Sequence, residues 1–157
     1  MKITFCTPEE KKRYVNYLVS RYGISISILN ECAWITYGLS VFMISKTWEK
    51  ILIEKELNLF SVGIQAFTNG KEFQPTANFI TLMGEHITQN CMELPEGKLL
   101  SFFQGKSLSK TEAKSIRVLS DGWVAVSSKG KVVGSASLKG NHLIPNLPGH
   151  VHASESE

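Results

Sequence analysis

The last third of the chain consists of short β-branched and aromatic runs separated by glycine-containing turns. Residues 123–126 (Trp-Val-Ala-Val) and 132–136 (Val-Val-Gly-Ser-Ala) flank the turn sequence Ser-Lys-Gly-Lys at 128–131. A second turn, Lys-Gly-Asn at 139–141, precedes Leu-Ile-Pro at 143–145. Runs of this length joined by such turns are typical of antiparallel strands in a small barrel or sandwich. We therefore expect a compact β-rich unit near the C-terminus.

A short helix is predicted just before these strands. Pro95 and Glu96 suit a helix N-terminus, apolar residues continue the helix to Phe103, and Gly105 ends it. The β-rich unit then runs from about Cys91 to residue 157, which is 67 residues. A unit of this size would bury only about 60% of its unfolded-chain surface on its own. We therefore expect it to dock on the first part of the chain.

The first helix is marked by a capping box, in which Thr7 is the N-cap, Pro8 the first helical residue and Glu10 the third. Gly23 is placed to end this helix. Apolar residues recur at three- and four-residue steps between these ends, which predicts one buried face. The face contains Tyr14, Val15, Leu18 and Tyr22.

Strands and a second helix are expected next. Residues 24–28 alternate isoleucine with serine, which predicts a half-buried strand with three isoleucines on the core face. Residues 33–37 and 41–44 are β-branched and aromatic runs, and the connection at 38–40 suits a hairpin. Ser45 is placed to cap the second helix. The predicted apolar side of that helix consists of Trp48, Ile51, Leu52 and Leu57.

A second hairpin is predicted further on, with a strand at 58–67, a turn at Thr-Asn-Gly (68–70) and a return strand at 73–82. A short helix is expected at 84–90. The sequence therefore predicts an α+β protein in two domains. Residues 1–90 form an N-terminal α/β domain with an antiparallel sheet and flanking helices, and residues 91–157 form a small β-barrel.

The positive charge of the chain is concentrated in its second part. The net charge is +3, with nine Lys or Arg against eight Asp or Glu in residues 1–90, and eight against four in residues 91–152. Cysteines are only three and distant in sequence, so we expect reduced thiols and neither disulfides nor a zinc site. The charge-free apolar stretch at 32–45 has 14 residues, whereas a membrane span needs about 20. With no signal-peptide pattern, an intracellular protein is expected.

No catalytic, metal or cofactor site is predicted. Gly105-Lys106-Ser107 resembles the end of a phosphate-binding P-loop, but Leu100 stands where that loop requires glycine. His150 and His152 lack a third ligand nearby. The single aspartate, Asp121, precedes a glycine and is predicted to form a turn, which leaves few aspartate-based catalytic sites possible.

The order and spacing of several blocks resemble a known family. The blocks of the first part are the first helix with 24–28, Ile-Ser with Lys-Ile-Leu across 44–52, and Ser-Val-Gly leading to Phe-Thr-Asn-Gly-Lys-Glu-Phe across 61–73. Those of the second part are 94–97 (Leu-Pro-Glu-Gly), 101–106 (Ser-Phe-Phe-Gln-Gly-Lys) and 122–126 with Val-Gly at 133–134. These blocks resemble the Nip-seven-like group, small biogenesis factors of the large ribosomal subunit in which an α/β domain precedes a C-terminal PUA domain.

The resemblance implies a non-enzymatic RNA-binding protein that acts in ribosome biogenesis and pre-ribosomal-RNA processing through a PUA-type β-barrel. Its implied partners are RNA, from a ribosomal precursor, and ribosome-assembly proteins, with no membrane. The expected location is the cytoplasm in a prokaryote and the nucleus or nucleolus in a eukaryote. Two alternatives stay open: a protein-interaction adaptor, and an accessory RNA-binding subunit of an RNA-modifying enzyme.

In a PUA-type domain, the loop after the helix and the last hairpin face RNA, so the basic residues there should pair with phosphates. The prediction requires these groups to share one side of the barrel. Alternatively, each lysine is an ordinary solvated side chain and Gly105 a plain helix C-cap. Residues Phe102, Phe103 and Trp123 are expected to be core rather than base-stacking. The predicted RNA-binding residues are Lys98, Gly105, Lys106, Lys110, Lys129, Lys131, Lys139, Asn141 and His142.

Overall fold

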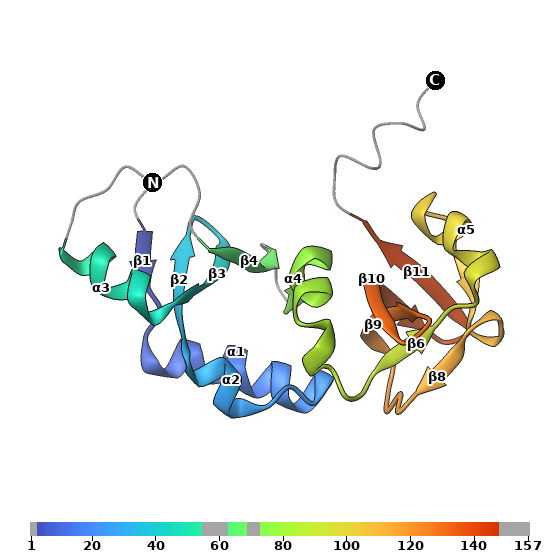
Figure 1. The fold of residues 1–157 in the computed structure, drawn as a ribbon, viewed down its shortest axis with the longest axis horizontal. Coiled ribbons are helices and arrows are strands. Elements are labelled where there is room, and N and C mark those ends of the chain that lie inside the picture. The colour runs from blue at the N-terminus through green and yellow to red at the C-terminus, as the bar shows by residue number, and fades with distance from the viewer. Residues whose placement is uncertain (1–2, 55–62, 69–72, 148–157) are drawn as a thin grey trace, which may run out of the picture.

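The computed structural model describes residues 3–54, 63–68 and 73–147, which form two β-sheets with helices around and between them (Figure 1). The first sheet is antiparallel in chain order, with β1 (Ile3–Phe5), β2 (Cys32–Tyr37), β3 (Ser40–Ser45), β4 (Ile64–Thr68) and β5 (Gln74–Pro75). The second has the order β7-β11-β10-β9-β6-β8, with β6 (Cys91–Glu93), β7 (Leu108–Ser109), β8 (Lys114–Ile116), β9 (Gly122–Ser128), β10 (Lys131–Lys139) and β11 (His142–Asn146). The helices are α1 (Pro8–Tyr22), α2 (Ile26–Asn30), α3 (Lys46–Glu54), α4 (Ala77–Leu82) and α5 (Leu99–Phe103), with short 3-10 turns η1 (Gly84–His86), η2 (Glu96–Lys98) and η3 (Lys110–Glu112).

The second sheet curls into a half-barrel (Figure 1). The strands β9, β10 and β11 form two successive hairpins, as the turn sequences predicted, and β6 pairs in parallel with β9. Because the outermost strands β7 and β8 do not pair with each other, the barrel stays open. The predicted α+β class is confirmed, with an antiparallel sheet and helices first and a half-closed barrel second.

Helix α1 begins and ends where the sequence predicted. The Thr7 hydroxyl accepts the Glu10 N–H at 3.2 Å, and the Glu10 carboxylate accepts the Thr7 N–H at 2.8 Å. Gly23 adopts a left-handed backbone, with φ of 66°, and donates its N–H to Val19. The buried face contains Val15, Leu18 and Tyr22, whereas Tyr14 is only half-buried.

The first predicted hairpin is also confirmed. The strands β2 and β3 pair from Cys32 with Ser45 to Tyr37 with Ser40, and α3 begins directly after Ser45. Leu52 of α3 packs against a small cluster around Ile44. Trp48, predicted on the apolar side of this helix, is instead 50% exposed. Leu57, the last predicted member of that side, lies outside the described residues.

The strand predicted at 24–28 is wrong. The segment leaves α1, turns at Ser25 and becomes the short helix α2, so that Ile24 is buried while Ile26 is 53% exposed. Both edges of the following strand β2 are paired, one with β3 and the other with β1, which the sequence did not reveal. A strand directly before β2 therefore has no place beside it, and the alternating pattern is overridden by tertiary packing.

The second predicted hairpin is confirmed only near its turn. Phe67 of β4 pairs with Pro75 of β5, but residues 58–62 and 69–72 lie outside the described part of the chain. The return strand predicted to reach residue 82 is wrong, because α4 starts at Ala77. Thr76 is its N-cap, accepting the Phe79 N–H at 3.1 Å. Pro75 has no N–H to continue a ladder, so a helix with this cap is the better local solution.

The helix before the C-terminal strands is present as η2 followed by α5. The Gly105 N–H bonds to the Phe102 carbonyl at 3.0 Å and the Lys106 N–H to the Ser101 carbonyl at 3.0 Å. These two bonds and the Gly105 φ of 80° form a Schellman end. Phe102 is buried against Gly134 of β10, where the absence of a side chain permits close packing.

The two sheets share a junction rather than a loose linker. Helix α4 lies between them (Figure 1), and the core of the first sheet also includes Cys91 of β6 and Ala125 of β9. The segment that leads into β6 also bonds to the end of α1. The Thr88 N–H donates to the Tyr22 carbonyl, and the Thr88 hydroxyl donates to the Gly23 carbonyl. The expected docking of the second part on the first is therefore observed.

Candidate nucleic-acid interface

Four of the predicted RNA-binding residues gather at one end of the half-barrel. Lys139 is opposite His142 in the β10–β11 hairpin, and His142 is opposite Ser109 in the β11–β7 pair. The Lys110 N–H donates to the Asn141 carbonyl at 2.8 Å, which holds η3 beside the hairpin turn. The hairpin-end group, as we call it, consists of Lys110, Lys139, Asn141 and His142.

Side chains fix this end of the sheet as well. The Asn141 amide donates to the Ser109 hydroxyl at 3.0 Å, and the Asp121 carboxylate accepts the Gly140 N–H at 2.7 Å. Both contacts set the direction of the β10–β11 turn. The group is therefore positioned by the hairpin register and by backbone hydrogen bonds, while Lys139, Asn141 and His142 are exposed to solvent.

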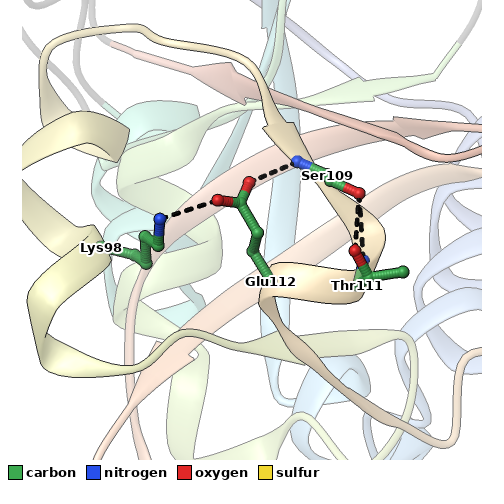
Figure 2. Close-up of polar contacts among 4 residues, drawn as sticks. All are labelled: Lys98, Ser109, Thr111 and Glu112. Atoms are coloured by element: carbon green, nitrogen blue, oxygen red, sulfur yellow. Dashed lines mark hydrogen bonds and ion pairs between the residues drawn. The ribbon is translucent and has the colours of Figure 1, made fainter.

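Lys98 lies next to this group but is engaged in an ion pair (Figure 2). Its ammonium is 2.7 Å from one oxygen of Glu112, whose other oxygen accepts the Ser109 N–H at 2.8 Å. The hydrogen bond from Lys98, followed by that from Ser109, lowers the pKa of the Glu112 carboxyl group. A phosphate at Lys98 would have to compete with this carboxylate.

Gly105 lies near Leu147, which follows the end of β11 opposite to His142, and Lys106 lies between Gly105 and the edge strand β7. Lys106 is exposed and precedes Leu108, which pairs with Leu143 of β11. The edge strand β7 thus connects Lys106 to the hairpin-end group. Within the described ranges, the only ion pairs are Lys98–Glu112 and Lys129–Glu96, so Lys106, Lys110 and Lys139 have no carboxylate partner there.

Lys129 and Lys131 lie elsewhere, at the β9–β10 turn. This turn and the hairpin-end group are at opposite ends of β10, a strand of nine residues, so Lys131 and Lys139 are about 26 Å apart at the rise of an extended strand. Lys129 is also 3.0 Å from Glu96, and the Gly130 N–H bonds to Glu93. The structure does not bring these two lysines together with the other predicted residues.

A groove that sequence reasoning missed lies between α1 and the second sheet. It has a volume of about 1060 Å³ and is lined on one side by α1 and β4 and on the other by β9, β10 and β11. Its cationic residues are Arg13, Arg21 and Lys139 and its carboxylate is Asp121. The exposed aromatic surface comes from the half-buried rings of Tyr14, Tyr17, Phe73 and Trp123.

One signal for the groove was present in the sequence. Arg13, Tyr17 and Arg21 are spaced four residues apart, so they share one face of α1. The opposite wall of the groove comes from residues roughly a hundred positions later, and no local pattern relates the two walls.

The expectation that Trp123 and the Phe102–Phe103 pair belong to the core holds for Phe102, whereas Phe103 is 43% exposed.

The three thiols of the described residues are partly or fully buried. Burial, with a smaller contribution from Glu10, raises the pKa of the Cys6 thiol to about 11. Burial also raises the pKa values of Cys32 and Cys91, so the thiols are protonated near neutral pH. Among residues 3–54, 63–68 and 73–147, no three His, Cys, Asp or Glu side chains come together as metal ligands. In the same ranges, every helix is too short or too polar to cross a lipid bilayer.

The antiparallel sheet with its helices, followed by the curled half-barrel, is the α+β fold of PUA-domain proteins. The structure is similar to a conserved PUA domain protein from Thermoplasma acidophilum, with a TM-score of 0.63 and 15% identity over 97% of this chain and 99% of that one. It is also similar to the hypothetical protein PH0734.1 from Pyrococcus horikoshii OT3, with a TM-score of 0.57 and 10% identity over 96% and 85% of the two chains. At sequence identities this low, the similarity shows a shared fold alone.

The sequence itself is similar to a ribosomal RNA small subunit methyltransferase F from Psychromonas ingrahamii. The two are 30% identical over 99 residues, which is 60% of this chain but 20% of the methyltransferase. The chain thus matches about a fifth of the length of that relative. A comparison with described protein families finds no match.

Proposed function

We propose that this chain is a non-enzymatic RNA-binding protein that acts in the maturation of ribosomal RNA through the hairpin end of its half-barrel. The observation that carries the proposal is the hairpin-end group, with Lys106 further along the β7 edge: three lysines without a carboxylate partner in the described ranges, of which Lys110 and Lys139 lie next to Asn141 and His142. The PUA-type fold supports it, because the resemblance described above implies RNA binding at this face.

Two ribosomal settings remain candidates. The first is ribosome biogenesis and pre-ribosomal-RNA processing, as in the Nip-seven-like group, with ribosome-assembly proteins as partners. The second is an accessory RNA-binding role beside an RNA-modifying enzyme, which the likeness to a ribosomal RNA methyltransferase favours. Purification of the chain from its own cells with and without RNase distinguishes these from the adaptor alternative. An adaptor keeps its protein partners after RNase treatment, whereas an RNA-bound factor loses them.

Salt dependence provides the physical test of the proposed face. On single-stranded RNA, the slope of log affinity against log salt is about −0.7 for each phosphate that is neutralised. Three lysines therefore predict a slope of about −2 for the wild-type chain. The double variant Lys106→Ala/Lys110→Ala should bind more weakly and reduce the magnitude of the slope by about 1.4. Fluorescence anisotropy with a 12-nucleotide random-sequence RNA at several salt concentrations measures both quantities.

The matched control is Lys129→Ala/Lys131→Ala, which removes the same charge at the far end of β10. This control should keep an affinity close to that of the wild type. Equal losses in the two double variants would mean that only net charge matters, and a flat salt profile for the wild type would contradict RNA binding through phosphates.

A further inference from the structure

The groove between α1 and the second sheet is continuous with the proposed RNA face. Lys139 belongs to both: it is part of the hairpin-end group, and it lines the groove on the β10 side. The opposite wall carries Arg13 on α1. A polyanion that follows the lysines of the hairpin end would therefore reach the mouth of the groove at Lys139.

The wall formed by α1 presents stacked planar groups. The Tyr17 and Phe73 rings have centroids 5.1 Å apart and an interplanar angle of 29°, and the Arg13 guanidinium lies 5.6 Å from the centre of the Phe73 ring. Tyr14 meets the Phe73 ring edge-on at 5.7 Å. Aromatic rings and guanidinium planes are the surfaces on which unpaired nucleobases stack.

Two of the charged groups in the groove already have partners. Arg21 donates from Nε to the Trp123 carbonyl at 2.7 Å, and its two Nη atoms donate to Ser120 at 2.8 and 3.0 Å. Asp121 accepts from Gly140. The Arg21 contacts join the two walls, and the Asp121 contact lies within the wall formed by the second sheet. Among the cations that line the groove, Arg13 and Lys139 are the two whose charged groups make no hydrogen bond or ion pair within the described part of the chain, and they lie one on each wall.

We infer that this groove is a second contact for single-stranded RNA, in which bases stack against the Tyr17–Phe73–Arg13 wall while Arg13 and Lys139 meet the phosphates. The inference rests on the proposed function and extends it to unpaired nucleotides. The groove is lined by three cationic side chains and one carboxylate, and this excess of positive charge favours binding of a polyanion. The volume of about 1060 Å³ lies just above the usual range for small-molecule sites and has room for bases that have left a helix.

The aromatic and cationic parts of the site are separable by substitution. Phe73→Leu keeps an apolar side chain but removes the ring, so affinity for the single-stranded 12-nucleotide RNA should fall about tenfold with an unchanged salt slope. On this inference Arg13 adds about 0.7 to the slope of about 2 in magnitude expected from the three lysines, so Arg13→Ala should weaken binding and remove that share. A 12-base-pair RNA duplex cannot offer its bases to the wall, so Phe73→Leu should leave duplex binding unchanged.

Lys12→Ala is the matched control, because Lys12 is exposed beside Arg13 on α1 but does not line the groove. Thermal unfolding of each variant verifies that it folds. If Phe73→Leu is destabilised, Arg13→Ala still tests the groove, because Arg13 is exposed and its replacement should not affect folding. If Arg13→Ala matches Lys12→Ala while Lys106→Ala/Lys110→Ala loses affinity, the groove inference is overturned and the proposed function stands. If the wild-type chain binds neither RNA, both are overturned.

Discussion

At the scale of single residues, Asn90 is a buried polar residue that bonds to several segments at the junction of the two sheets. It is 1% exposed and adopts a left-handed backbone with φ of 52°, which asparagine tolerates better than most residues. Its side-chain amide donates to the Arg21 carbonyl at the end of α1, and its side-chain oxygen accepts the Leu119 N–H at 2.9 Å. Its backbone bonds to Arg117 and Ala125. One residue thus satisfies polar groups from three segments.

Replacement of Asn90 should therefore destabilise the whole protein. Asn90→Ala leaves the Arg21 carbonyl and the Leu119 N–H without partners and places a β-carbon in a left-handed conformation, for a loss of about 3 kcal/mol in unfolding free energy. Urea denaturation measures this loss. Asn90→Gly removes the same two side-chain bonds without the backbone strain, so it should be less destabilised than Asn90→Ala by about 1 kcal/mol. An Asn90→Ala variant as stable as the wild type would contradict this account.

At the scale of elements, the sequence predicted those whose signals are local. The capping box and glycine of α1, the turns of the β9–β10–β11 hairpins and the Schellman end of α5 all lie where residue types indicated. The errors at α2 and α4 occur where β-branched runs were interpreted as strands. Both edges of β2 are already paired beside α2, and Pro75 with the Thr76 cap ends the strand before α4. The available hints were Ser25 and Thr76, which stand at helix N-cap positions.

The candidate site divides in the same way. The hairpin register brings Lys139, Asn141 and His142 together, and a turn sequence predicts that register. The separation of Lys129 and Lys131 follows from the length of β10, which alternation alone did not define. The groove was missed because α1 meets β9 and β10 only through tertiary packing, and such long-range pairing has no sequence signature.

Two glycines of the α5 region provide a prediction for this element. Gly105 has a φ of 80°, whereas Gly97 has no left-handed backbone and nothing near the position of a β-carbon. Gly105→Ala should therefore lower the free energy of unfolding by about 1 kcal/mol, because alanine resists the left-handed conformation. Gly97→Ala should be neutral or stabilising by up to about 1 kcal/mol, because it restricts the unfolded chain. Chemical denaturation compares the pair, and a loss in Gly97→Ala equal to that in Gly105→Ala would exclude backbone conformation as the cause.

At the scale of the whole molecule, the two sheets are expected to unfold together. The core under the first sheet includes residues of β6 and β9, and Asn146 of β11 donates to the Pro75 carbonyl at 3.1 Å. Gly84 lies so close to Val132 of β10 that an added β-carbon would be 2.7 Å from the Val132 Cβ. A single methyl group added at Gly84 would therefore push the two parts of the molecule apart.

Gly84→Ala should therefore lower the stability of both sheets by the same amount. Hydrogen exchange measured by mass spectrometry should give equal opening free energies for the slowest amides of β3 and β10 in the wild type, and an equal decrease for both in the variant. The control is Gly97→Ala, which has open space around it. Exchange of β10 at a lower opening free energy than β3 would show that the sheets open separately.

The outer strands of both sheets are short. On the described residues, β1 and β8 have three residues each, while β5 and β7 have two, and β5 includes a proline. A foreign strand that approached any of these borders would find only a few backbone groups to pair with. Fibril growth from the native state is thereby disfavoured, and the folded protein should tolerate the high concentrations that spectroscopy and crystallisation demand.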